Sequence, residues 1–133
     1  MQSYACAILL RGREILLGRR SPERRAYPST WDILGGRVED GESAEAALLR
    51  ELGEEIGIAP TEFRHIKNLF DDNVGGRGAA TYHVYVVTAW SGGEPVINNH
   101  EHSALKWFPI ADACDLPDLA LAEYPDLFRS LGA

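Results

Sequence analysis

Long hydrophobic runs, cysteine and methionine are all scarce in this sequence of 133 residues. No stretch reaches the roughly eighteen consecutive apolar residues that a membrane-spanning helix needs, so we expect no membrane partner. The N-terminus has neither the basic start nor the small-residue cleavage site of a secretory signal, and we therefore expect a cytoplasmic location. Only two cysteines are present, Cys6 and Cys114, and we expect both to be reduced and structural.

Basic residues do not outnumber acidic ones. Thirteen Lys and Arg stand against twenty Asp and Glu, which gives a net charge of −7. Because affinity for long nucleic acid depends on neutralising phosphates, this balance argues against such a partner and favours a small phosphorylated ligand. The charge is uneven: seven acids lie between Glu39 and Glu55, where Arg50 is the single base.

The chain has no repeat, linker or low-complexity segment, and its 45% hydrophobic content is that of a globular protein. We expect one domain over residues 1–133. Apolar runs predict strands at 3–10, 14–17, 63–70, 81–90 and 104–108. A polar loop is expected at 71–79 and a closing helix at 118–131. With a second helix near residue 50, these elements predict an α/β fold, an α/β/α sandwich around a mixed sheet.

The most informative segment is an acidic helix expected between Ser43 and Gly57. Ser43 is a good N-cap, and a glycine followed closely by Pro60 is a typical helix end. Three carboxylates fall in the last two turns, at the negative end of the helix dipole: Glu51, Glu54 and Glu55. Their spacing puts them on one face, where each like-charge pair costs roughly 0.2–0.5 kcal/mol. A sequence that accepts both penalties is expected to bind a cation there.

The residues around these acids support this interpretation. An apolar stripe beside them is expected to anchor the helix in a core, and its members are Leu48, Leu49, Leu52 and Ile56. Ahead of the helix, a loop expected at 34–42 contains three glycines, which let backbone approach a ligand closely. Strand, glycine-rich loop and acidic helix together predict a metal and phosphate site.

Residues 36–58 resemble the signature of the Nudix hydrolases, G-x5-E-x7-R-E-U-x-E-E-x-G-U, where U is a bulky aliphatic residue. The segment matches every fixed position, namely Gly36, Glu42, Arg50, Glu51, Leu52, Glu54, Glu55, Gly57 and Ile58. In length and element order the chain is similar to the small, MutT-like members. The resemblance implies the Nudix fold and hydrolysis of a diphosphate linkage with a divalent cation, usually Mg²⁺, for which Mn²⁺ is a substitute.

The resemblance also implies roles for the acids. Glu54 and Glu55 are expected to be the main metal ligands, joined by Glu51 and by the carbonyl of Gly35. Outside the box, Glu101 lies six residues before a tryptophan, which matches the position of a further ligand. Glu51 is also a candidate general base. The expected metal site is therefore built from carboxylate and carbonyl oxygens, which suit a hard cation.

The remaining box residues are expected to shape the site. Arg50 completes the expected catalytic set with Glu51 and Glu54, and its planar fork is expected to hold an acidic partner by two hydrogen bonds. Three residues are expected to be structural, namely Gly36, Glu42 and Gly57. Leu34 stands where many family members have proline, and this departure bears on the path of the Gly35 carbonyl.

Substrate-binding residues are less closely defined by the sequence. Arg19 and Arg20 are expected to contact phosphates, with a solvated loop as the alternative. Phe70 and Tyr82 are expected to stack on a base, with ordinary core packing as the alternative.

The histidines do not form a recognisable metal pattern. Magnesium prefers oxygen, and the spacing of His83, His100 and His102 matches no zinc motif, so we interpret them as strand and loop residues. His102 is of interest because it follows Glu101.

The favoured hypothesis is hydrolysis of a nucleoside triphosphate to the monophosphate and pyrophosphate by a monomer or homodimer. Hydrolysis of ADP-ribose, a nucleotide sugar, a dinucleoside polyphosphate or an oxidised nucleotide remains open. A nucleotide-sensing module without activity is a second class, although such modules usually have a degraded box. An isoprenoid diphosphate isomerase is a third, although neither cysteine lies in a matching motif.

Overall fold

The computed structural model describes residues 2–72 and 78–132. Within these ranges the chain forms seven strands and three helices. The strands are β1 (Gln2–Arg11), β2 (Glu14–Arg20), β3 (Trp31–Asp32), β4 (Leu34–Arg37), β5 (Ala59–Asp71), β6 (Ala80–Ser91) and β7 (His102–Pro109). The helices are α1 (Ala44–Ile56), α2 (Ile110–Cys114) and α3 (Tyr124–Leu131).

Strand β1 is the centre of the sheet, because it pairs with three other strands. It runs parallel to β6 and antiparallel to β2 and β4, so the sheet is mixed. Strand β5 lies on the far side of β6, so β6 is an interior strand. Strands β1 and β2 form a hairpin, with Gly12 at φ 62° in its turn.

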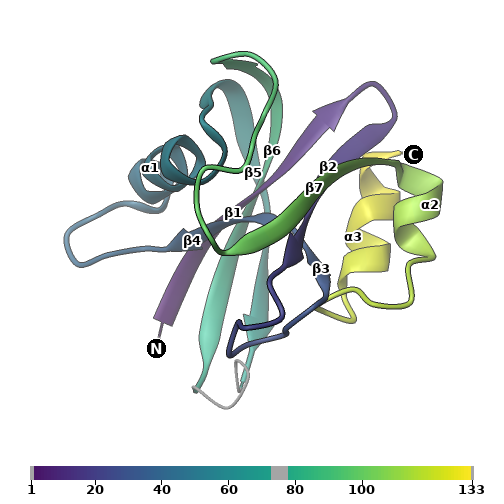
Figure 1. Ribbon diagram of the computed structural model, residues 1–133. Helices are drawn as coiled ribbons and strands as arrows, with labels where there is room; N and C mark the ends of the chain where they lie inside the picture. Colours follow the sequence, from purple (N-terminus) through teal and green to yellow (C-terminus); the bar gives the residue numbers. More distant parts are fainter. Residues whose placement is uncertain (1, 73–77, 133) are drawn as a thin grey trace.

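Helices cover both faces of the sheet, with α1 on one side and α2 and α3 on the other (Figure 1). Successive residues of β1 face opposite layers: Ala5 and Ala7 pack in the core beneath α1, whereas Cys6 and Ile8 pack in the core that contains residues of α3. Each core is continuous with apolar residues of β2 and β6. This arrangement confirms the predicted α/β/α sandwich.

The C-terminal helix differs from its expectation. It begins at Tyr124 rather than 118, with a proline in its first turn. Leu119 instead forms an isolated parallel bridge with Trp31: the N–H of Trp31 donates to the Asp118 carbonyl (2.8 Å), and the N–H of Ala120 donates to the Trp31 carbonyl (2.9 Å). The short helix α2 was not expected, because five residues carry too little periodic pattern.

Two further expectations need comment. The segment expected as a glycine-rich loop contains a strand, since 34–37 form β4 against β1. Leu49 does not belong to the buried stripe of α1; it is 42% exposed, whereas the other three members are buried. Most of the loop expected at 71–79 lies outside the described residues.

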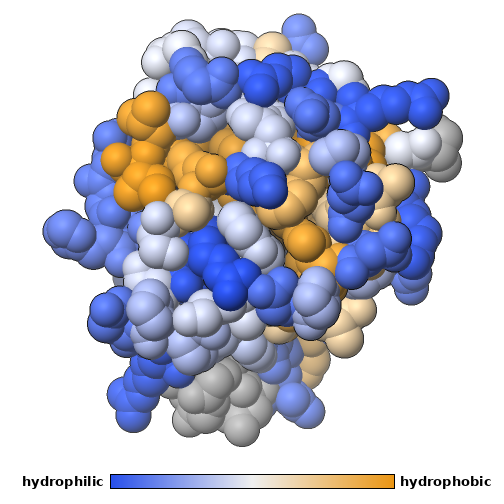
Figure 2. Space-filling view, turned by 45° about the vertical axis from the view of Figure 1, so that its right-hand side comes forward, coloured by the Kyte–Doolittle hydropathy of each residue, from blue (hydrophilic) through white to orange (hydrophobic). Residues whose placement is uncertain are grey.

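Among the described residues, no helix is long and apolar enough to cross a bilayer. The face shown in Figure 2 is mostly hydrophilic and carries apolar patches between the charged residues. The large apolar side chains that are most exposed in the described chain are Leu49, Phe70, Val96 and Ile97.

Candidate metal and phosphate site

Local signals at both ends fix the acidic helix α1. The Ser43 side-chain oxygen accepts a hydrogen bond from the N–H of Ala46 (3.1 Å), and Gly57 ends the helix in the left-handed region at φ 70°. Both boundaries confirm the sequence prediction. Glu51, Glu54 and Glu55 therefore do lie at the negative end of the helix dipole, where they favour a cation.

The three acids of the helix lie in different environments. The side chain of Glu54 is 60% exposed and that of Glu51 is 15% exposed, whereas Glu55 is fully buried. Burial raises the pKa of Glu51 and of Glu55, while Arg50 opposes the shift for Glu51 and His102 opposes it for Glu55. The site thus has an inner carboxylate, an intermediate one and an outer one.

The paired glycines of β4 allow the acids to approach the sheet. A Cβ atom at Gly36 would lie 2.2 Å from the carboxyl carbon of Glu51, so only glycine leaves room for this side chain. Gly35 has φ 144°, and a Cβ there would lie 2.1 Å from the Ala5 carbonyl oxygen of β1. Leu34, which replaces the usual proline, is fully buried and pairs with Ala7. The backbone at Gly35 is therefore fixed by strand pairing.

Arg50 connects the loop, the strand and the helix. Its Nε and Nη2 atoms donate to the two carboxylate oxygens of Glu42 at 2.8 and 2.9 Å, which is the two-point pair expected from the sequence. Nη1 donates to Glu51 (2.9 Å) and Nη2 to the Arg37 carbonyl (2.9 Å). The hydrogen bond from Arg50 lowers the pKa of Glu42 to about 2. A weaker contact of 3.3 Å reaches Glu54.

The segment before β7 brings a second group of side chains to the end of α1. The N–H of Asn98 donates to the Glu55 carbonyl (2.9 Å), and the N–H of Val96 donates to that of Ile56 (3.2 Å). On the other side, the Ser21 hydroxyl donates to the His100 carbonyl (2.9 Å). These bonds satisfy carbonyls at the helix end and hold residues 98–102 against it.

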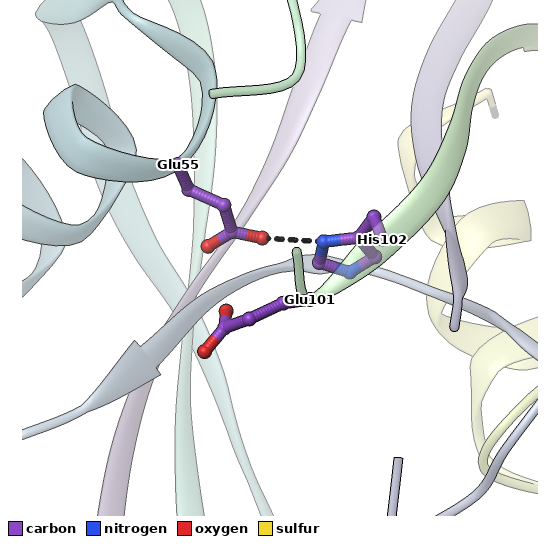
Figure 3. A group of neighbouring side chains, drawn as sticks. All are labelled: Glu55, Glu101 and His102. Carbon is purple, nitrogen blue, oxygen red and sulfur yellow. Dashed lines mark ion pairs between the residues drawn. The ribbon is translucent and has the colours of Figure 1, made fainter. Parts of the chain in front are cut away.

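Glu55, Glu101 and His102 meet at this point (Figure 3). The ligand atoms of the three side chains lie within 4.8 Å of one another, and His102 Nδ1 is 2.9 Å from Glu55 Oε1. Glu101 also forms an ion pair with Arg24 (3.2 Å). The structure thus brings Glu101 to the box, as expected, and adds His102, for which the only signal in the sequence was its place next to Glu101.

The donor set fits a hard divalent cation. Despite the short contact between them, neither carboxylate oxygen of Glu55 nor either ring nitrogen of His102 has a hydrogen bond of normal geometry within the described chain. A buried carboxylate without such partners is costly unless a cation is nearby. Carboxylates of Glu55 and Glu101 lie close enough together to offer the oxygen ligands that a hard divalent cation prefers.

A cavity of about 230 Å³ opens beside the acids. Glu51, Glu101 and His102 line this cavity. Tyr4 and Tyr82 also line it, and their rings stack with centroids 5.2 Å apart and an interplanar angle of 27°. A larger hollow of about 450 Å³ lies beside α2 and α3, and its lining includes none of the predicted site residues.

The structure separates the four predicted substrate residues into two pairs. Arg20 and Tyr82 line the cavity beside the acids. Among the residues that the structure describes, Arg19 does not line this cavity. It forms an ion pair with Asp118 and lies over the Trp31 ring. Phe70 is 54% exposed and lies beside a separate depression.

Sequence reasoning missed several residues of the cavity wall, namely Tyr4, Tyr27, Asp32 and Tyr124. Asp32 accepts hydrogen bonds from the Tyr124 hydroxyl and from Arg20 (3.3 Å for Arg20 Nη1). The two residues that meet at Asp32 come from β2 and α3, so no local pattern identifies this contact.

Comparison with known proteins identifies the family of this chain. A model of the NUDIX domain matches residues 1–131. The CTP pyrophosphohydrolase of Escherichia coli is 35% identical over 135 residues, covering 100% of this chain and 95% of that protein. The putative 8-oxo-dGTP diphosphatase 2 of Mycobacterium tuberculosis is 32% identical over 117 residues, covering 86% of this chain and 78% of that protein.

Solved structures lead to the same conclusion. The MutT NUDIX hydrolase of Burkholderia pseudomallei superimposes with a TM-score of 0.83 at 28% identity, covering 96% of this chain and 95% of that one. The E. coli ORF135 protein gives a TM-score of 0.81 at 32% identity, covering 100% and 91%. The chain belongs to the Nudix family. It is a MutT-like Nudix hydrolase of the pyrophosphohydrolase class.

Proposed function

We propose that this protein is a Mg²⁺-dependent pyrophosphohydrolase that converts a nucleoside triphosphate to the monophosphate and pyrophosphate. The observation that carries the proposal is one cavity lined both by carboxylates and by a stacked tyrosine pair. A nucleotide carries phosphates and an aromatic base, which suit these two kinds of lining group. Two relatives carry names that refer to nucleoside triphosphates, CTP and 8-oxo-dGTP.

In this proposal the acids have different roles, which follow from how deeply each one is buried. Glu55 and Glu101, with Glu54 and the Gly35 carbonyl, hold the metal. When bound, Mg²⁺ offsets charge on the phosphates and makes a water molecule a better nucleophile. Glu51 is the candidate base: its pKa is raised by burial, and Arg50 holds its carboxylate in place (2.9 Å).

The cationic side chains of the wall are proposed to act on the phosphates. Arg20 and Arg24 both line the cavity. Arg20 is oriented by hydrogen bonds to the Ala26 carbonyl (2.8 Å) and Asp32 (3.3 Å), and Arg24 by its ion pair with Glu101. Positioning and charge stabilisation are most of what phosphoryl transfer requires of a protein.

The tyrosines are proposed to bind the base. Tyr82 and Tyr4 present stacked rings in the wall, and Tyr27 lines the same cavity. Stacking on a ring is worth roughly 1–3 kcal/mol per base and tolerates several bases. We therefore expect Tyr82→Ala to raise KM for a nucleoside triphosphate by at least about tenfold, with a smaller effect on kcat.

The proposal is tested by a panel assay with Mg²⁺, read by product chromatography. The panel contains the common nucleoside triphosphates, oxidised guanine nucleotides, ADP-ribose, dinucleoside polyphosphates and nucleotide sugars. We expect Glu54→Gln to lower turnover of the best substrate by at least about 100-fold. Glu45→Gln is the matched control, because Glu45 is an exposed acid in the first turn of the same helix.

Two results would contradict the proposal. Near-normal turnover by a folded Glu54→Gln protein would remove the metal-dependent mechanism. Tight nucleotide binding without turnover across the panel would favour the sensing module instead. Removal of divalent metal with a chelator should abolish turnover, and added Mg²⁺ or Mn²⁺ should restore it.

A further inference from the structure

We propose that His102 is a positioning residue for the metal site: its imidazole holds the carboxylate of Glu55 so that one oxygen faces the ring and the other faces the cation. The inference rests on the proposed metal-dependent function. It adds a residue outside the box to the machinery of that site.

Both side chains of this contact are buried. Glu55 is 1% exposed and His102 is 7% exposed. His102 Nδ1 lies 2.9 Å from Glu55 Oε1, and Figure 3 shows the two side chains pointing toward one another from α1 and from the start of β7. The second carboxylate oxygen points away from the ring (Figure 3). A buried polar pair of this kind has no solvent to compensate for a lost partner.

The surroundings fix the imidazole in place. A Cβ atom at Gly18 of β2 would lie 2.5 Å from His102 Cδ2 and 2.9 Å from Nε2, so the ring occupies space that only glycine leaves free. The backbone of Arg20 is paired with that of His102 across the sheet. Because the ring is wedged between β2 and the end of α1, its position does not depend on a metal.

The 2.9 Å contact is an ion-pair contact rather than a hydrogen bond of normal geometry, and it places the ring where the outer partner of a ligand carboxylate is usually found. A ligand carboxylate is usually held by an outer hydrogen-bonding partner, and loss of such a partner typically costs about 10–100-fold in metal affinity or activity. Arg50 has this role for Glu51. No other titratable side chain in the described chain contacts the Glu55 carboxylate at ion-pair distance, so His102 is the available partner.

The test uses two replacements of similar size to one another, His102→Asn and His102→Leu. The asparagine amide can donate from near the position of Nδ1, whereas leucine branches in the same way and has no donor. Mn²⁺ affinity of the intact protein is measured by EPR titration, without substrate. We expect His102→Leu to weaken Mn²⁺ binding by about 10–100-fold and His102→Asn to stay within about threefold of the unmodified protein. His100→Leu is the control, since His100 is exposed and two residues away.

Three outcomes would overturn the proposal. One is Mn²⁺ affinity that His102→Leu leaves unchanged. The second is a folded His102→Asn protein that binds Mn²⁺ about 10–100-fold more weakly than the unmodified protein, which would show that an amide donor at this position does not support the site. The third is a directly coordinated ¹⁴N signal in pulsed EPR of the unmodified Mn²⁺ complex, which would make His102 a ligand. The last two measurements decide the matter even where the leucine variant does not fold. Because no readout here is hydrolysis, failure of the proposed substrate would leave the test intact.

Discussion

The guanidinium of Arg50 and the carboxylate of Glu42 face each other in a two-point pair, with N–O distances of 2.8 and 2.9 Å. The pair spans eight residues and joins the turn before α1 to the middle of that helix. Glu42 also accepts from the N–H of Glu39 (2.9 Å), so the turn is closed around the same carboxylate. The remaining donors of Arg50 reach Glu51 and β4. The pair therefore helps to hold the acidic side chains in position.

Arg50→Lys should therefore impair activity although it keeps the charge. A lysine ammonium cannot make the parallel pair with Glu42 while also holding Glu51. We expect a loss of about 10–100-fold in kcat/KM with the fold retained, checked by steady-state kinetics and circular dichroism. Arg129→Lys is the control, since Arg129 pairs with Asp126 at the surface of α3 (2.9 Å). Equal kinetics for Arg50→Lys and the unmodified protein would show that the fork is dispensable.

Gly36→Ala should damage the site more than the fold. The added methyl group would lie 2.2 Å from the carboxyl carbon of Glu51, a side chain that can rotate away. We expect at least about a tenfold fall in turnover, because a displaced catalytic group loses its near-attack geometry. Gly53→Ala is the contrast, since a Cβ there meets nothing closer than 3.9 Å and the position is inside α1. It should raise the free energy of unfolding by about 0.5–1 kcal/mol with activity intact.

The two adjacent leucines of α1 should respond very differently to truncation. Leu48 is fully buried beneath the helix, whereas Leu49 is 42% exposed. Leu48→Ala should lower the free energy of unfolding by about 2–5 kcal/mol, since it opens a cavity in the core. Leu49→Ala should cost less than about 1 kcal/mol. Urea unfolding of both variants measures the difference, and equal losses would contradict the helix orientation.

Tyr27 should make the protein less stable in alkali. Burial and the hydrogen bond to Asp71 raise the pKa of Tyr27 to about 12, above the unfolded value of about 10. The folded state keeps its proton where the unfolded state loses it, so this contribution is complete below pH of about 10 and disappears as the pH rises toward 12. Tyr27→Phe should flatten the decline in unfolding free energy over that window. An unchanged slope in urea titrations at successive pH values would refute this.

The box helix could be predicted from sequence because its determinants are local. Ser43, Gly57 and the spacing of the acids act within a few residues, and all lie where expected. The burial of Glu55 could not be predicted in this way. It depends on His102, which lies 47 positions later in the chain and reaches the helix through the pairing of β7 with β2.

Strand register explains why only one of the two predicted aromatic residues lines the cavity. Phe70 pairs with Thr81 and Leu69 with Tyr82 across β5 and β6, so Phe70 and Tyr82 point to opposite faces of the sheet. Composition identified both aromatic residues, but only the register shows which one reaches the cavity. The sequence likewise predicts a loop where β4 lies, because its glycines are typical of loops and its partner β1 lies some thirty residues earlier.

The parallel pairing of β1 with β6 has a consequence for how the site is made during synthesis. Cys6 is paired with Val84, so β1 can form this pairing only after more than half of the chain has been synthesised. The whole box leaves the ribosome earlier. Yet its innermost acid is enclosed only when residue 102 arrives. A nascent chain that stops at the end of β6 therefore carries every residue of the family signature and lacks a closed metal pocket.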